Sequence, residues 1–327
     1  MENKLLIIYG PTAVGKTSLA FGLARKYNGD ILSADSRQVY RGMDIITGKD
    51  LPKNSKFEIL NLKTKDKLGY WEAPEGVRVW LTDLVDPKEE FSVAQWVGYA
   101  KEVMDLVWKD GKLPIIVGGT GFYIKALIDG FDTLEIKPNK RLRENLIGKT
   151  AEELFETLAS VNSIRAGNMN QSDRKNPRRL MRAIEVALSK QNGSLKTKSN
   201  GSIISNENLL FIGLKAPRNL LYERIDSRVD ARVAGGIEET KKLLQEGVMW
   251  DDQSMTGIGY SELKEYILGK VSLDEAVARW KKSEQDYAKR QLLWFKNDKR
   301  ALCFDTTQTN WETEVEKTVE NWYDKGE

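Results

Sequence analysis

Short apolar runs alternate with amphipathic segments along the first third of the chain. Residues 5–9 (LLIIY) form the first run, and five consecutive apolar residues are too few for a buried helix, so they predict a buried strand. A glycine-containing turn follows. After it, apolar residues recur at the spacing of one helix face, at Leu19, Ala20, Leu23, Ala24 and Tyr27. The pattern predicts strand, turn and helix in that order.

The same periodicities predict the later elements. Further buried strands are predicted at residues 30–34, 113–117 and 209–214. Long amphipathic helices are predicted at residues 92–108 and 273–295, and a loop before a helix at residues 255–260. Residues 53–80 predict a small β excursion with a turn near Gly69.

A change of pattern marks an inserted domain. From about residue 131 to 190 the chain is helical and strongly charged, without a strand signal. Residues 191–208 are polar and aperiodic, which is typical of a flexible loop. We therefore expect an α/β protein with a parallel sheet core flanked by helices, residues 1–130 and 206–327. Residues 131–205 would form a helical insertion domain.

The turn after the first strand carries a phosphate-binding motif. Residues 10–17 (GPTAVGKT) match G-x-x-x-x-G-K-[ST], and the flanking strand and helix are the context that the motif requires. Lys16 is expected to reach the outer phosphate, and the Thr17 hydroxyl to ligate Mg²⁺. The expected diphosphate-binding residues are Gly10, Pro11, Thr12, Ala13, Val14, Gly15, Lys16 and Thr17. The alternative is a chance glycine turn before a helix, which the full match disfavours.

A carboxylate follows the second predicted strand. Asp35 lies one β–α unit past the phosphate-binding loop, at the carboxyl edge of a parallel sheet, where ligands bind. From position alone it is equally a helix N-cap or a catalytic group. The strand at residues 113–117 ends in glycines and Thr120, where an NTP hydrolase would usually carry an aspartate. This ending disfavours a motor-type ATPase.

Composition excludes several kinds of chemistry. The 327 residues include one cysteine, Cys303, and no histidine, which excludes an internal disulfide, a cysteine-built zinc site and histidine acid–base catalysis. A carboxylate or a lysine must therefore carry any proton transfer. Because the net charge is only +3, binding of a polyanion must depend on local clusters. The start does not resemble a signal peptide and no apolar run is long enough to span a membrane, so we expect a cytoplasmic protein without membrane contact.

Two helices place basic residues together. Pro177 suits the first turn of a helix whose basic side would carry Lys175, Arg178, Arg179 and Arg182. This side is either a solvated face or a set of phosphate contacts. Later in the chain, Arg224, Arg228 and Arg232 stand at i, i+4 and i+8. They either pair with the interleaved aspartates on the helix surface or close over phosphates as a lid.

Six segments together resemble one enzyme family. They are GPTAVGKT, SADSRQVYRGMDIITGK, PIIVGGTGFYIKAL, NPRRLMRAIEV, GIGYSEL and AKRQLLWFK. In type and order they resemble the tRNA dimethylallyltransferases, the IPP transferase family. The resemblance implies a P-loop NTPase-like core with a helical insertion. It also implies transfer of a dimethylallyl group from dimethylallyl diphosphate to the exocyclic amine of adenosine 37, next to the tRNA anticodon, with release of diphosphate.

The resemblance also implies roles for individual residues. Asp35 would be the general base, while Lys16, Arg228 and Thr17 with Mg²⁺ would neutralise the departing diphosphate. Residues implied to contact the anticodon stem-loop of tRNA are Asp35, Ser36, Arg37, Gln38, Thr120, Arg141, Arg178, Arg179, Arg182, Lys289, Arg290 and Gln291. The target adenine would have to leave its stack to reach the prenyl group. We expect the enzyme to act as a monomer.

The chain departs from the family pattern at a few positions. Val79 and Trp80 stand where paired histidines often occur, and Arg178 stands where glutamine is common. Thr256 and Ser261 stand where some members carry arginine. These departures concern local packing and the choice of tRNA more than the reaction.

Three other functions use part of the same pattern. A P-loop kinase of a nucleotide or small molecule would use the loop, Thr17 and the arginines, with Asp35 orienting the acceptor hydroxyl. An adenylate prenyltransferase would share the loop and the aspartate but would not need the large helical insertion. A nucleic-acid-binding NTPase would show RNA-stimulated hydrolysis.

Overall fold

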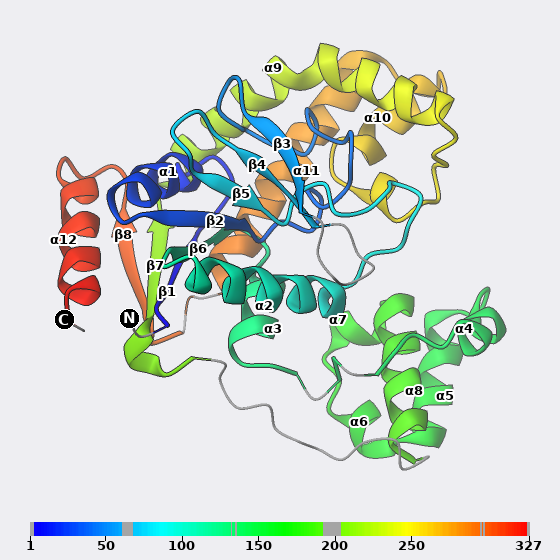
Figure 1. Ribbon diagram of the computed structural model, residues 1–327. Coiled ribbons are helices and arrows are strands. Elements are labelled where there is room, and N and C mark those ends of the chain that lie inside the picture. Colours follow the sequence, from blue (N-terminus) through cyan, green and yellow to red (C-terminus); the bar gives the residue numbers. More distant parts are fainter. Residues whose placement is uncertain are drawn as a thin grey trace. The chain divides into compact units, whose positions relative to one another are not determined.

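The fold was analysed in a computed structural model that describes residues 3–60, 68–131, 133, 134, 136–191, 204–294, 296 and 298–325. The chain divides into two compact units. The first comprises residues 1–128 and 202–327, and the second comprises residues 129–201. Figure 1 shows both, with the second unit in green.

The first unit is built on one eight-stranded sheet. Its strands are β1 (Leu5–Tyr9), β2 (Gly29–Ser33), β3 (Lys56–Leu60), β4 (Leu68–Glu72), β5 (Arg78–Trp80), β6 (Leu113–Gly118), β7 (Leu209–Lys215) and β8 (Ala301–Asp305). The strand order is β3-β4-β5-β2-β6-β1-β7-β8. From β5 to β8 all neighbours pair in parallel, whereas β3, β4 and β5 form an antiparallel meander. The predicted α/β class with a parallel core is confirmed.

Helices cover both faces of this sheet (Figure 1). The helices of the first unit are α1 (Lys16–Lys26), α2 (Val93–Lys109), α3 (Gly121–Ile128), α9 (Arg218–Gln245), α10 (Tyr260–Ile267), α11 (Leu273–Trp294) and α12 (Trp311–Tyr323). The side chains of Leu6, Ile8 and Ile115 form a buried cluster with residues of α1 and α12. On the other side α2 contacts β2 and β6, and the Trp96 indole donates a hydrogen bond of 3.0 Å to the Ser33 carbonyl. Burial on both faces explains why the central strands are continuously apolar in sequence.

The central parallel strands deliver their carboxyl ends to one edge of the sheet. The phosphate-binding loop follows β1, Asp35 follows β2 and the glycine-rich turn follows β6, three neighbouring strands. This edge is where a parallel sheet binds ligands. The predicted juxtaposition of the loop and the aspartate is therefore a property of the strand order.

In the second unit, all the described secondary-structure elements are helices. Its helices are α4 (Lys140–Leu146), α5 (Ala151–Val161), α6 (Ser163–Gly167), α7 (Gln171–Arg174) and α8 (Pro177–Gln191). Leu154 and Leu158 of α5 pack with Leu180 and Ile184 of α8 in a hydrophobic cluster of its own. The helical prediction is confirmed, and α8 begins at Pro177 as its sequence predicts.

Some predicted elements differ from the structure. Gly69 lies inside β4, paired with Ile59, so the predicted turn at this glycine is wrong. A Cβ at Gly69 would collide with the Phe57 ring, which explains the glycine by close packing across the strands. Of the loop predicted at residues 191–208, residue 191 ends α8, Asn206–Asn208 form a 3₁₀ helix, and residues 192–203 lie outside the described residues. In the part of the chain that the structure describes, no helix is long and apolar enough to cross a membrane.

Candidate active site

The phosphate-binding loop has the backbone conformation that its glycines permit. Gly15 caps α1 in the left-handed region at φ 99°, which a side chain would disfavour. Gly10 comes so close to β7 that a Cβ would lie 2.6 Å from the Leu214 carbonyl oxygen. The loop therefore curls tightly at the end of β1, and α1 begins with Lys16 and Thr17 facing the same space.

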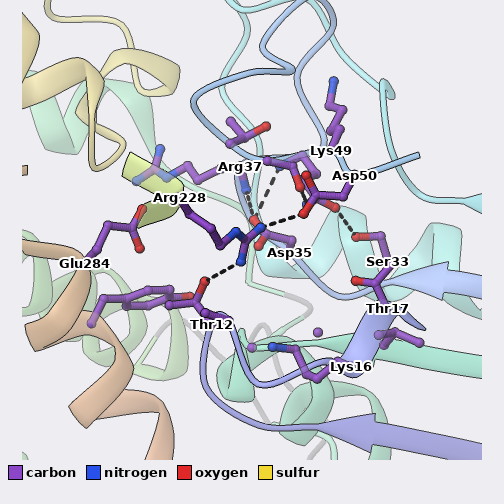
Figure 2. A pocket seen from close by; sticks show the side chains of 18 of the residues that line it. Thr12, Lys16, Thr17, Ser33, Asp35, Arg37, Lys49, Asp50, Arg228 and Glu284 are labelled. Atoms are coloured by element: carbon purple, nitrogen blue, oxygen red, sulfur yellow. Dashed lines mark hydrogen bonds and ion pairs between the residues drawn. The ribbon is translucent and has the colours of Figure 1, made fainter. Parts of the chain in front are cut away.

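This space is a cavity of about 900 Å³ (Figure 2). It is lined by the phosphate-binding loop, the Asp35 turn, the segment 46–51, one side of α9 and one side of α11. All of these belong to the first unit. The cavity brings together Lys16, Thr17, Asp35 and Arg228, as the sequence and the family resemblance predict.

Lys16 is a buried cation in this cavity. Its ammonium donates a hydrogen bond of 2.7 Å to the Pro11 carbonyl. Burial and the positive charge of Arg228 lower the pKa of Lys16 to about 8, against the opposing effect of Asp35. An anion bound next to such a lysine stabilises its protonated, charged form.

Asp35 caps a turn and not a helix. Its Oδ1 accepts hydrogen bonds from the backbone N–H groups of Arg37, at 2.8 Å, and Gln38, at 3.4 Å. The backbone N–H of Ser36, which directly follows Asp35, donates to Thr120 Oγ1 at 3.3 Å. These bonds hold a half-buried carboxylate at the cavity wall, so the helix N-cap alternative is wrong and the catalytic alternative stays open.

The other residues of the Asp35 turn have protein partners. Arg37 donates to the Gln253 carbonyl at 2.8 Å and to Thr256 Oγ1 at 3.2 Å. Gln38 accepts a hydrogen bond from the Ser33 hydroxyl at 2.9 Å and donates to the Gly48 carbonyl at 3.1 Å. These contacts connect the turn to two other segments of the cavity wall.

Two of the three arginines of α9, Arg224 and Arg228, contact the phosphate-binding loop. Arg224 Nη1 lies 3.4 Å from the Ala13 carbonyl oxygen, and Arg228 Nη1 lies 3.4 Å from Thr12 Oγ1. Arg228 pairs with Asp50 at 2.6 Å (Figure 2). Arg232 pairs with the same carboxylate at 3.1 Å.

The interleaved aspartates of α9 turn to α11 instead. Asp226 accepts a hydrogen bond from Gln285, and Asp230 pairs with Lys281. The prediction of ion pairs along α9 between these aspartates and the arginines is therefore wrong. The alternative, in which the arginines close on the phosphate loop, agrees with this geometry.

Gln291 of α11 forms a hydrogen bond with the phosphate-binding loop. Its Oε1 accepts a hydrogen bond of 2.8 Å from the Thr12 backbone N–H. Gly119 leaves room for it, because a Cβ there would collide with the Gln291 amide nitrogen. One turn earlier, burial and the charge of Asp35 raise the pKa of Tyr287 to about 12, against the opposing effects of Thr120 and Gln291. Gln291 is only 5% exposed and lines the cavity, so the contact with tRNA that the resemblance implies for it would have to be made inside the cavity.

The sequence did not identify Glu284 and Asp50, which are among the acidic residues that line the cavity. Burial raises the pKa of Glu284 on α11, although Arg232 and Arg228 oppose the shift. Glu284 precedes Tyr287 and Gln291 by three and seven residues, so helical spacing could have placed it on the cavity side. Asp50 lies in a loop, and no local sequence pattern predicts that it pairs with two arginines distant in sequence.

The remaining residues implied to bind tRNA lie in two groups. On α11, Lys289 pairs with Asp286, while Arg290 is exposed, lies over the Tyr287 ring and lines the cavity. In the second unit, Arg141 and Arg178 are exposed.

Two arginines of α8 have partners within the second unit. Arg179 pairs with Asp173. Arg182 pairs with Glu185 at 3.0 Å and donates to the carbonyls of Thr133 and Ile136 at 2.9 and 2.8 Å. These bonds make Arg182 a structural residue of the unit.

The donor set bears on the expected Mg²⁺ ion. Among the described residues no group of three or more His, Cys, Asp or Glu side chains could hold a metal ion. Thr17 lines the cavity at the first turn of α1, beside Lys16. This arrangement fits a cation that takes one hydroxyl from the protein and its other oxygen ligands from a phosphate group and water.

Two family models match the chain. The one described as IPP transferase matches residues 38–298, and the one described as isopentenyl transferase matches residues 3–62. The tRNA dimethylallyltransferase of Thermomicrobium roseum is 35% identical, over 98% of this chain and 91% of its own length. That of Carboxydothermus hydrogenoformans is 36% identical, over 98% of this chain and 97% of its own length.

Solved structures agree with these relatives. The tRNA isopentenylpyrophosphate transferase of Bacillus halodurans superimposes with a TM-score of 0.67 at 34% identity, over 98% of this chain and 97% of the other. A eukaryotic dimethylallyltransferase acting on tRNA shares the fold, with a TM-score of 0.73 at 23% identity, over 98% of this chain and 79% of the other. The resemblance seen in the six sequence segments is confirmed: the chain belongs to the IPP transferase family.

Proposed function

We propose that the protein transfers a dimethylallyl group from dimethylallyl diphosphate to the exocyclic amine of an adenosine beside the anticodon of tRNA, with release of diphosphate. The observation that carries this proposal is one cavity that combines a phosphate-binding loop and arginines with the carboxylate of Asp35. Transfer of a dimethylallyl group to tRNA is also what the names of the family's curated members describe.

The cationic side of the cavity suits the leaving group. In the transfer, the bond between the allylic carbon and the diphosphate oxygen breaks, and negative charge grows on the diphosphate. Lys16 and Arg228 offer positive charge at the loop that would hold it. Preorganised charge at a departing anion lowers the barrier without reorganisation of solvent. A Mg²⁺ ion held by Thr17 and the diphosphate would further neutralise the leaving group.

The acceptor side requires a proton acceptor. An exocyclic amine on adenine is a weak nucleophile, and it loses a proton as its nitrogen forms the new bond to carbon. Asp35 is positioned by backbone N–H groups at the cavity wall, and the chain has no histidine that could replace it. In this proposal the Asp35 carboxylate takes the amine proton. All residues given a role lie in one chain, so the reaction needs no second copy.

The acceptor adenine must leave its base stack to reach a cavity inside the protein. Exposed basic residues outside the cavity, such as Arg141 and Arg178, would contact the phosphates of the anticodon stem-loop. Such contacts supply affinity and orientation, whereas the cavity selects the base.

The test is to incubate the purified protein with Mg²⁺, dimethylallyl diphosphate and unmodified tRNA, and to analyse the digested nucleosides by mass spectrometry. An adenosine that gains one dimethylallyl group only when both substrates are present is the expected result. Asp35→Asn, which keeps the side-chain shape, should lower the rate by roughly 10²–10⁴-fold because the proton acceptor is lost. Movement of the terminal phosphate of ATP to a small acceptor, without a prenylated nucleoside, would instead identify a kinase.

A further inference from the structure

Asp50 forms an ion pair with Arg228, the arginine that the proposed function assigns to the diphosphate. Its carboxylate lies on the segment 46–51 of the cavity wall, with Oδ2 at 2.6 Å from Arg228 Nη2. The other terminal nitrogen of Arg228 reaches only as far as Thr12 Oγ1, at 3.4 Å. The strongest bond of Arg228 in the free protein is therefore made to Asp50 (Figure 2).

A guanidinium binds phosphate oxygens best through two parallel N–H groups. While Nη2 of Arg228 is bonded to Asp50, this two-pronged contact is not available to a ligand. A diphosphate that enters the loop beside Thr12 must therefore compete with Asp50 for the same donors.

Asp50 also pairs with Arg232, so it keeps one cationic partner when its bond to Arg228 breaks. The second carboxylate oxygen, Oδ1, pairs with Arg232 Nη2 at 3.1 Å. The Arg232 guanidinium lies against Gly48, where a Cβ would collide with it, and its side chain is only 18% exposed. Arg232 is thus a fixed cation one helical turn beyond Arg228, on the side away from the phosphate-binding loop.

The exposure of Asp50 makes such an exchange inexpensive. Its side chain is 58% exposed, so water can solvate the oxygen that leaves Arg228. Without an anion, the cavity holds Lys16 beside the arginines of α9, and these like charges repel one another. A nearby carboxylate relieves this repulsion when the ligand is absent.

We propose that Asp50 is an internal counter-anion of the diphosphate site. It holds Arg228 in the free protein, yields Arg228 to the incoming diphosphate while remaining on Arg232, and takes Arg228 back when the product diphosphate leaves. Asp50 thereby weakens diphosphate binding and speeds product release. The inference rests on the proposed function, because it takes diphosphate as the ligand of the loop.

The test measures the affinity of the full-length protein for inorganic diphosphate by calorimetry at constant Mg²⁺. Asp50→Asn should lower the Kd by roughly three- to tenfold, because a competing charge is lost. Asp50→Glu, which keeps the charge, should stay nearer to the wild type. Product inhibition by diphosphate in the transfer assay should strengthen in Asp50→Asn by the same factor.

Asp230→Asn is the matched control. Asp230 lies on α9 between the two arginines and is also 58% exposed, but it pairs with Lys281. Its substitution removes the same charge without freeing Arg228, so the Kd should stay within about twofold of the wild type.

The outcomes separate the inference from the proposed function. If the wild type binds diphosphate and Asp50→Asn binds it equally or more weakly, Asp50 merely positions Arg228 and the inference is wrong. If Asp230→Asn tightens binding as much as Asp50→Asn, the effect is general electrostatics and the inference is again wrong. If the wild type binds no diphosphate, the proposed function fails together with the inference.

Discussion

Lys16 shares its cavity with the arginines of α9. Burial and Arg228 lower its pKa to about 8, so a part of the population carries an uncharged amine at mildly alkaline pH. An anion bound at Lys16 favours the protonated form, which makes the affinity of this site depend on pH.

Diphosphate binding should weaken as the pH rises through 8. Below this pH Lys16 is protonated and attracts the anion, and above it the attraction is lost, by roughly tenfold in Kd for each further pH unit. Calorimetry between pH 7 and 9 measures this dependence. Lys16→Arg keeps its charge over the whole range, so its profile should be flatter. Parallel profiles for the two proteins would contradict the role of Lys16.

Local motifs revealed the residues whose place in the site follows from the chain on either side of them. Gly15 and Lys16 belong to a continuous loop, and Asp35 follows a strand, so both positions could be predicted. Asp50 acquires its place through Arg228, which lies 178 residues away. A contact over that distance depends on the packing of α9 against the sheet edge, which no local pattern encodes.

At the scale of elements, α11 lines the cavity with one face. Glu284, Tyr287 and Gln291 follow one another at helical spacing on that face, while Arg290 is exposed. The family resemblance grouped Arg290 and Gln291 as neighbours in one tRNA-binding segment. Both line the cavity, but the structure distinguishes them by burial, because Arg290 is exposed whereas Gln291 is only 5% exposed.

Substitutions on α11 should separate these two roles. Gln291→Leu removes the acceptor of the half-buried Thr12 N–H and should cost about 0.5–1.5 kcal/mol of unfolding free energy. Arg290→Ala should leave the thermal stability unchanged and weaken tRNA binding. Thermal unfolding and tRNA titration measure both. An unchanged Tm for Gln291→Leu together with weakened tRNA binding would return Gln291 to the tRNA interface.

The basic face of α8 should divide in a similar way. Arg178→Ala should reduce the slope of log affinity for tRNA against log salt by about one, without loss of stability. Arg182→Ala should destabilise the helical unit instead, because Arg182 supports the buried Glu185 and two backbone carbonyls. Equal effects of the two substitutions on the salt slope would show that Arg182 leaves its partners to bind tRNA.

Two elements near the carboxyl end of the described chain escaped prediction altogether. β8 is half exposed in an irregular pattern, and α12 buries only Val315 and Val319 among its thirteen residues. Edge elements of this kind bury too little apolar surface to produce a clear periodicity. By contrast, β1, β6 and α2 are deeply buried and were predicted closely.

At the scale of the whole molecule, the two units have separate hydrophobic clusters that share no described residue. We therefore expect two transitions in scanning calorimetry. Diphosphate at about 100 times its Kd should raise only the transition of the first unit, by roughly 5–10 °C. Leu158→Ala truncates a fully buried side chain of the helical unit. It should lower only the transition temperature of that unit, since such a cavity costs about 2–5 kcal/mol. A single transition that responds to both would show that the units unfold as one.

The strand order also has a consequence for folding during synthesis on the ribosome. β1 is made first, yet its sheet neighbours are β6 and β7, and the helical unit is encoded between these two. At roughly 5–20 residues per second, translation reaches β6 after roughly 5–20 s and β7 after about twice that time. The nascent chain thus carries the apolar segment LLIIY with an open edge while the helical unit is already complete. This segment therefore remains prone to non-native strand pairing, and open to chaperone binding, until β7 has been made.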